Sequence, residues 1–183
     1  MAEAVSALNG ASYQGFASIR EIGPLGMISL RAKPDVPGLS NAVQAAVGLA
    51  LPEQRKIVQN GARAVGWMSP DEYLIVLPYA EVGAAMAAIA AALKGQHHLA
   101  ANVSDARAVF RIEGAKSAQV LQKLAPADLA KLEPGELRRT RTAQVAAAFW
   151  AEGDGYTLVC FRSVASYVMG LLTHSAMPGS ELA

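Results

Sequence analysis

The chain has 183 residues, of which 52% are hydrophobic and 17% are charged, and its formal net charge is +1. This composition excludes disorder caused by charge excess, and the length suffices for one domain or for two closely packed halves. The 16 basic residues are scattered along the chain, which argues against nucleic acid as a partner. We therefore expect a folded protein with a core of its own and with apolar surface available to a partner.

The cysteine content and the ends of the chain bear on where the protein works. The single cysteine, Cys160, excludes an intramolecular disulfide framework and favours a reducing, cytoplasmic location. Residues 1–10 lack the basic start and the apolar stretch of a signal peptide. The most apolar segment, 82–93, is shorter than the roughly 20 residues that a membrane span needs. We expect neither secretion nor a membrane anchor, and we expect residues 1–11 and 175–183 to be loosely held.

The first half of the chain predicts a strand, a helix, a hairpin and a second helix. Alternating apolar and polar residues indicate strands, whereas apolar residues at three- and four-residue spacing indicate helices. Residues 12–22 fit either an edge strand or a short arm. The predicted elements are a strand over 27–33, a helix over 40–51, strands over 56–60, 62–67 and 73–77, and a helix over 79–93.

The second half repeats this plan, with a strand over 109–112, a helix over 116–125, strands over 138–142, 143–151 and 156–161, and a helix over 164–172. A shift of 83 positions (150 minus 67) places Trp67 on Trp150 and Tyr73 on Tyr156 without a gap. A chance likeness between two hairpin and helix units remains the alternative.

Strand, helix, two strands and helix form a split βαβ unit, in which helices cover one face of an antiparallel sheet. We therefore predict an α+β fold, a two-layer sandwich built from duplicated ferredoxin-like units. We expect one domain over residues 1–183, made of two repeats at about 27–95 and 103–174. The tight hairpins argue against a doubly wound parallel sheet.

The sequence contains no phosphate-binding loop and no grouping that predicts catalysis. His97 and His98 are adjacent on a polar connector, where neighbouring side chains of an extended chain point in opposite directions, so we assign them no metal. Cys160 lies in an apolar strand, where burial would keep its thiol protonated and suited to core packing. We predict no catalytic, cofactor-binding or metal-binding residue in this chain.

Charged residues at two places admit a structural or a functional interpretation. Asp71 and Asp154 occupy the repeat-related hairpin turns, where aspartate commonly bonds its own backbone, so a structural role is favoured. Arg138, Arg139 and Arg141 lie on a predicted strand, with Arg139 and Arg141 on one face. They would grip the carboxylates of a partner, or they would protect an edge strand from unwanted pairing. Both interpretations stay open.

Several segments resemble a known family. The segment Val103-Ser104-Asp105-Ala106-Arg107-Ala108-Val109-Phe110-Arg111-Ile112-Glu113-Gly114, followed by a helix, is similar to the opening of the folate-binding domain of aminomethyltransferases. Gly66-Trp67-Met68-Ser69-Pro70-Asp71-Glu72-Tyr73, Ala127-Asp128-Leu129 and the stretch over 134–142 before Trp150 resemble the gamma subunits of heterotetrameric sarcosine oxidases. The resemblance covers roughly residues 27–174, and its motifs are turns and strands.

The resemblance implies a non-catalytic subunit that supports assembly of a complex of alpha, beta, gamma and delta subunits. Such a complex demethylates sarcosine oxidatively to glycine, with hydrogen peroxide and either formaldehyde or methylenetetrahydrofolate as products. The resemblance places FAD, FMN, NAD, zinc and tetrahydrofolate in the partner subunits and leaves a homo-oligomer open for the isolated chain.

The alternative is a stand-alone folate-binding or one-carbon transfer protein of the same fold. Folate-binding proteins of iron–sulfur cluster assembly carry a Lys-Gly-Cys-Tyr-x-Gly-Gln motif, which is absent here because the only cysteine lies in Val159-Cys160-Phe161.

Overall fold

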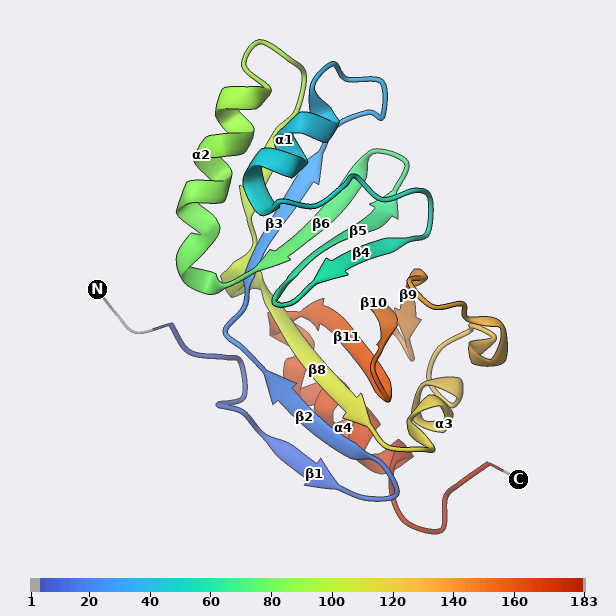
Figure 1. The fold of residues 1–183 in the computed structure, drawn as a ribbon. Helices are drawn as coiled ribbons and strands as arrows, with labels where there is room; N and C mark the ends of the chain where they lie inside the picture. Colours follow the sequence, from blue (N-terminus) through green and yellow to red (C-terminus); the bar gives the residue numbers. More distant parts are fainter. Residues whose placement is uncertain (1–3, 183) are drawn as a thin grey trace. The chain divides into compact units, whose positions relative to one another are not determined.

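The computed structural model describes residues 4–182 and contains two compact units, each with its own sheet and hydrophobic core (Figure 1). Residues 25–104 form one unit, which we call the internal unit. Residues 4–24 and 105–182 form the other, which we call the terminal unit because it holds both ends of the chain.

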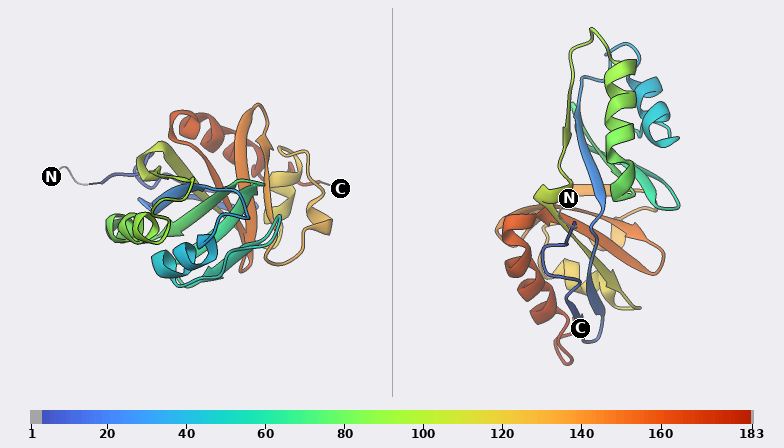
Figure 2. Two further views of the ribbon diagram at one scale, coloured as in Figure 1. Left: turned by 90° about the horizontal axis from the view of Figure 1, so that it is seen from above. Right: turned by 90° about the vertical axis from the view of Figure 1, so that its left-hand side faces the viewer.

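The internal unit is a five-stranded antiparallel sheet with two helices on one face. In Figure 2 both helices lie on the same side of this sheet. The strand order is β4-β5-β6-β3-β7, so the first strand, β3, lies between β6 and the last strand, β7, as in a ferredoxin-like fold, with β4 added at the edge. Its elements are β3 (Gly26–Arg31), α1 (Leu39–Val47), β4 (Ile57–Asn60), β5 (Arg63–Ser69), β6 (Glu72–Leu77), a 3₁₀ turn (Tyr79–Glu81), α2 (Val82–Ala92) and β7 (Leu99–Asn102).

The terminal unit has a six-stranded antiparallel sheet in the order β1-β2-β8-β11-β10-β9. Its strands are β1 (Ser12–Gln14), β2 (Ser18–Ile22), β8 (Arg107–Glu113), β9 (Leu137–Thr142), β10 (Val145–Glu152) and β11 (Gly155–Phe161). Its helices are α3 (Ser117–Gln122) and α4 (Ala165–Ser175), and short 3₁₀ turns cover Ser104–Ala106, Leu129–Lys131 and Arg162–Val164. Both helices bury apolar side chains against one face of the sheet.

The predicted α+β fold with duplicated ferredoxin-like units is confirmed, and the structure supplies the last strand of each unit. In the internal unit this strand is β7, which follows α2 and pairs with β3. In the terminal unit it is β2, which comes from the start of the chain and pairs with β8. The open question over 12–22 is thus resolved as two strands, and β7 is a strand that the sequence did not predict. That the chain is a single domain of repeats at about 27–95 and 103–174 stays a prediction.

A β-bulge makes the two hairpins differ in register. Trp67 lies opposite Tyr73, but the register of β5 and β6 then shifts by one residue, so Met68 is extra. β10 and β11 pair without a break, and Trp150 lies opposite Thr157. The ungapped match of Trp67 to Trp150 is therefore wrong in three dimensions. An extra residue rotates the strand that carries it and points the preceding side chain to the other face.

The consequence is visible in what the two tryptophans contact. Trp67 packs against the core beneath α1 and α2. Trp150 is buried outside the core of the terminal unit, whereas its neighbour Phe149 belongs to that core. Tyr73 and Tyr156, a second matched pair, each pack against the core of their own unit.

Helix α1 is shorter than predicted. The sequence pattern extended to residue 51, but the helix ends at Val47 because Gly48 adopts a left-handed conformation with φ of 72° and donates its N–H to Gln44 O. Glycine takes this conformation without steric cost, which makes it a common helix terminator. The released segment then turns toward Pro52 and forms one wall of the pocket described below.

The segments expected to be loosely held carry specific contacts. The buried carboxylate of Glu21 accepts hydrogen bonds from Ser6 Oγ, Leu8 N and Gly10 N, at 2.8, 3.0 and 2.9 Å. Near the other end, Lys123 Nζ donates to Ser175 O at 2.7 Å and to further oxygens of the tail.

Candidate partner-binding site

Among residues 4–182, no cluster of three or more His, Cys, Asp or Glu side chains could hold a metal ion. Cys160 is buried in the core of the terminal unit, and burial raises the pKa of its thiol from 9.0 to about 12, although nearby Arg107 acts to lower it. In this part of the chain no helix is both long and apolar enough to cross a bilayer.

The histidines and turn aspartates occupy surface positions. His97 and His98 border a second pocket with Arg31, and His98 Nδ1 lies 3.0 Å from a backbone oxygen two residues before it. Asp71 accepts a hydrogen bond from Ser69 Oγ at 2.9 Å and lies 3.6 Å from Arg31. A side-chain hydroxyl and an ion pair therefore fix this turn.

The second turn is held by a buried arginine. Asp154 lies 3.7 Å from Arg111, whose guanidinium also donates to Glu152 O at 2.5 Å and to Thr157 Oγ1 at 3.4 Å. A buried arginine is tolerated when its donors are satisfied in this way. The two aspartates thus share a structural setting across the repeat, in which each faces an arginine on a neighbouring strand.

The three predicted interface arginines lie on β9, which is an edge strand because it pairs only with β10. Arg139 and Arg141 are exposed and share one face of the strand, as the alternation predicted. Arg138 lies on the other face, and its guanidinium meets the buried carboxylate of Glu136 at 2.9 Å. The structure therefore brings two of the three arginines together, and their role in partner binding stays a prediction.

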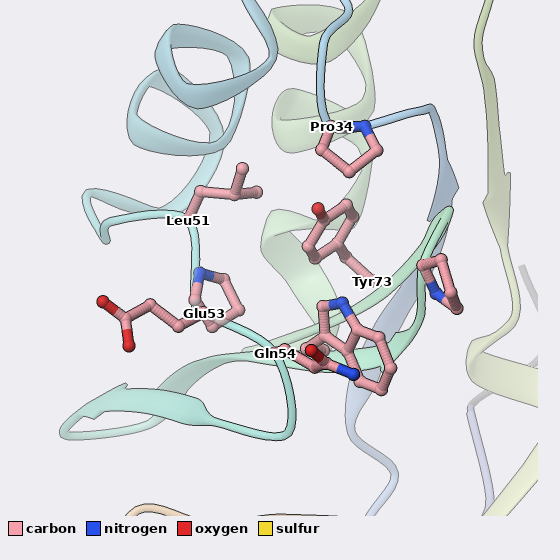
Figure 3. Close-up of a pocket in the computed structure, with 8 residues that line it drawn as sticks. Pro34, Leu51, Glu53, Gln54 and Tyr73 are labelled. Carbon is pink, nitrogen blue, oxygen red and sulfur yellow. The ribbon is translucent and has the colours of Figure 1, made fainter.

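A pocket of about 360 Å³ opens on the internal unit and was not predicted from the sequence. Figure 3 shows it between the loop that follows α1 and the end of the β5–β6 hairpin. Its walls are largely apolar, and three of its eight lining residues are prolines. The lining residues are Pro34, Leu51, Pro52, Glu53, Gln54, Trp67, Pro70 and Tyr73.

Two aromatic side chains, Trp67 and Tyr73, bring hydrogen-bond donors to this pocket. Tyr73 is 2% exposed, and burial raises the pKa of its phenol above the ordinary value of 10.0. Within residues 4–182, the Tyr73 hydroxyl and the Trp67 indole N–H bond to no protein group but stay open to solvent, because the buried side-chain atoms without a partner belong to Arg138, Thr142 and Trp150. In Figure 3 the Tyr73 hydroxyl points to the space between Pro34 and Leu51. Water can satisfy these two donors in the free chain, and a ligand that supplies acceptors can take its place.

The signal for this pocket was present in the sequence but could not be interpreted there. The prolines at 34, 52 and 70 appeared as separate helix and turn breaks, and Trp67 appeared as a counterpart of Trp150. These residues come from three separate segments, and only the folded chain brings them together around the pocket.

Comparison with known sequences points to one family. The sequence model of the sarcosine oxidase gamma subunit family matches residues 31–177. A sarcosine oxidase subunit gamma from Arthrobacter sp. is 33% identical over 147 residues, which is 78% of this chain and 71% of that protein. The subunit gamma from Corynebacterium sp. (strain P-1) is 34% identical over 148 residues, with the same coverage.

Comparison with solved structures agrees. A chain of the heterotetrameric sarcosine oxidase from Corynebacterium sp. U-96, in complex with pyrrole 2-carboxylate, superposes with a TM-score of 0.79 at 26% identity, covering 87% of this chain and 83% of that one. The aminomethyltransferase T of the glycine cleavage system from Bartonella henselae gives 0.65 at 14% identity, covering 87% of this chain and 46% of that protein. The second match shows a shared fold.

Proposed function

Because the chain belongs to the sarcosine oxidase gamma subunit family, we propose that it is a non-catalytic subunit that supports assembly of a heterotetrameric sarcosine oxidase. The observation that carries the proposal is the agreement of fold and sequence with a chain of such a complex over 87% of this protein.

In this proposal the partners are the alpha, beta and delta subunits, and the complex works in the cytoplasm. It demethylates sarcosine to glycine, with hydrogen peroxide and either formaldehyde or methylenetetrahydrofolate as products. FAD, FMN, NAD, zinc and tetrahydrofolate would be held by the partners, and this chain would contribute surface.

The edge strand β9 is the first surface to test. Arg139 and Arg141 project from one face of an edge that no strand of the terminal unit covers. A partner carboxylate can bind an arginine bidentately, which adds direction as well as charge to a contact. We propose that these two side chains meet acidic groups of a partner subunit.

Co-expression of a tagged chain with the alpha, beta and delta subunits tests the assignment. We expect a stoichiometric complex that survives affinity purification and oxidises sarcosine. Replacing Arg139 and Arg141 with glutamate should weaken the complex, more strongly at low salt, because charged contacts are screened by salt. A matched control replaces exposed Arg63, which pairs with Glu81 at 2.7 Å on the internal unit, and should leave the complex intact.

Titration of the isolated chain with tetrahydrofolate separates assembly from the alternative of a stand-alone folate protein. Tight binding by the solitary chain, together with failure to join the other subunits, would overturn the assignment.

A further inference from the structure

The pocket beside Trp67 and Tyr73 contains hydrogen-bond donors that nothing in the described chain satisfies. Trp67 and Tyr73 are directly opposed on paired strands, which brings their side chains close together on one face of the sheet. The prolines of the wall carry no N–H group, so they add no donor. The phenol of Tyr73 and the indole N–H of Trp67, together with the amide of Gln54, are therefore the side-chain donors that the lining offers to an acceptor from outside.

The chemistry of the occupant follows from this arrangement. An aliphatic side chain would exclude water from the Tyr73 hydroxyl without replacing the lost acceptor, which is unfavourable. A proline-containing extended segment supplies apolar rings for the walls and backbone carbonyls for the donors, and its prolines bring no N–H that needs an acceptor. Aromatic-lined grooves bind such segments elsewhere because the segment is already extended before it binds.

The charge of Glu53 at the pocket further restricts which residues the bound segment can carry. The exposed carboxylate of Glu53 borders the pocket and has no ion-pair partner within residues 4–182. Arg and Lys complement a carboxylate in this position, whereas an acidic residue would be repelled. The favoured segment thus carries a basic residue next to its prolines.

We propose that this pocket receives a proline-containing extended segment of a partner subunit, with Tyr73 and Trp67 donating hydrogen bonds to its carbonyls and Glu53 facing a flanking basic residue. The identification of the owner as a subunit of the complex rests on the proposed function. Recognition of the segment itself is a property of this chain alone. Direct pairing of Trp67 with Tyr73 puts the two side chains on one face, and the bulge at Met68 follows Trp67 at the end of β5.

A peptide titration of the full-length chain tests the pocket. The probe is a capped peptide of one arginine followed by five prolines, and the readout is the pair of indole N–H signals in a nitrogen–proton correlation spectrum. We expect the Trp67 signal to shift with saturation while the Trp150 signal stays in place, because Trp150 does not line the pocket. A capped glycine–serine peptide of equal length should leave both signals unmoved.

Variants test the individual contacts. Tyr73→Phe keeps the ring and removes the donor, so the affinity should fall about fivefold, as expected for one neutral hydrogen bond. Tyr156→Phe is the matched control at the repeat-related position outside the pocket and should bind as the unmodified protein does. Replacing the arginine of the peptide with glutamate should weaken binding if Glu53 acts as described.

Three results would overturn the inference. They are an unmoved Trp67 signal at millimolar peptide, an equal response to the glycine–serine peptide, and unchanged affinity in Tyr73→Phe. Equally tight binding of a capped single proline would replace the extended segment with a small-ligand site. If the complex assembles while the peptide does not bind, the pocket inference fails and the proposed function stands. If the peptide binds while the complex does not assemble, the proposed function fails and the recognition of the segment by this pocket stands.

Discussion

The buried carboxylate of Glu21 gives a sharp prediction about the stability of the terminal unit. Glu21 is 3% exposed and lies on β2, the strand that completes the ferredoxin-like sheet. Its oxygens accept hydrogen bonds from Ser6 Oγ, Leu8 N and Gly10 N. The carboxylate therefore organises the segment that precedes β1.

The size of the effect follows from the three donors. A hydrogen bond to a charged group contributes about 1.5–3 kcal/mol, and an unmet buried donor costs a similar amount. The segment is partly exposed, so water can replace some of these contacts in the Glu21→Ala variant. We expect a loss of about 3 kcal/mol in the free energy of unfolding, or about 6–12 °C in the melting temperature of a protein of this size. Glu21→Gln keeps one acceptor and should lose about half as much.

Denaturant unfolding together with amide hydrogen exchange checks this reasoning. Exchange at Leu8 and Gly10 should accelerate in Glu21→Ala, because these amides lose their acceptor. A variant within 0.5 kcal/mol of the unmodified protein, with unchanged exchange at both amides, would refute the reasoning: surface substitutions behave in that way, to within about 0.5 kcal/mol.

Two further predictions concern a glycine pair and the cysteine. A Cβ at Gly155 would overlap Ile112 O, so Gly155→Ala should destabilise the protein by about 2 kcal/mol or more in thermal unfolding. Gly170 lies on open helix surface, so Gly170→Ala should stabilise the protein by about 0.4–1 kcal/mol in the same measurement. Burial raises the pKa of the Cys160 thiol to about 12, so the folded protein should resist a thiol reagent at pH 8 and react fully in urea. The unfolded thiol ionises near its ordinary pKa of 9.0, so this stabilising contribution is present below about pH 9 and is lost as the pH rises toward 12. As the pH rises from about 9 to 12, the free energy of unfolding of Cys160→Ala should therefore fall less than that of the unmodified protein. Rapid labelling of the folded protein by the thiol reagent at pH 8 would contradict the burial of Cys160.

Much of the fold was accessible from sequence because its signals are local. Apolar periodicity predicted the four helices, and the matched positions of Tyr73 and Tyr156 identified the duplication. The closing strands were harder, since β7 consists of Leu-Ala-Ala-Asn and has no alternation to mark it. Its identity comes from pairing with β3, which is a contact between residues distant in the chain.

The pocket illustrates a second limit. Sequence similarity aligned Trp67 with Trp150, and a one-residue bulge then sent the two side chains to different environments. The sheet period of two makes any such slip reverse the facing of every residue before it. The motif around Trp67 was thus sufficient to indicate the family. The face of the sheet on which the Trp67 side chain lies, and therefore the pocket, could be seen only in the folded chain.

The role of this chain as an assembly subunit is tested most directly by native mass spectrometry of the purified complex. The account predicts one copy of this 19.1 kDa chain in each complex, and loss of that mass together with dissociation of the remaining subunits when the chain is left out. A fully active complex of the other subunits that never takes up this chain would contradict it.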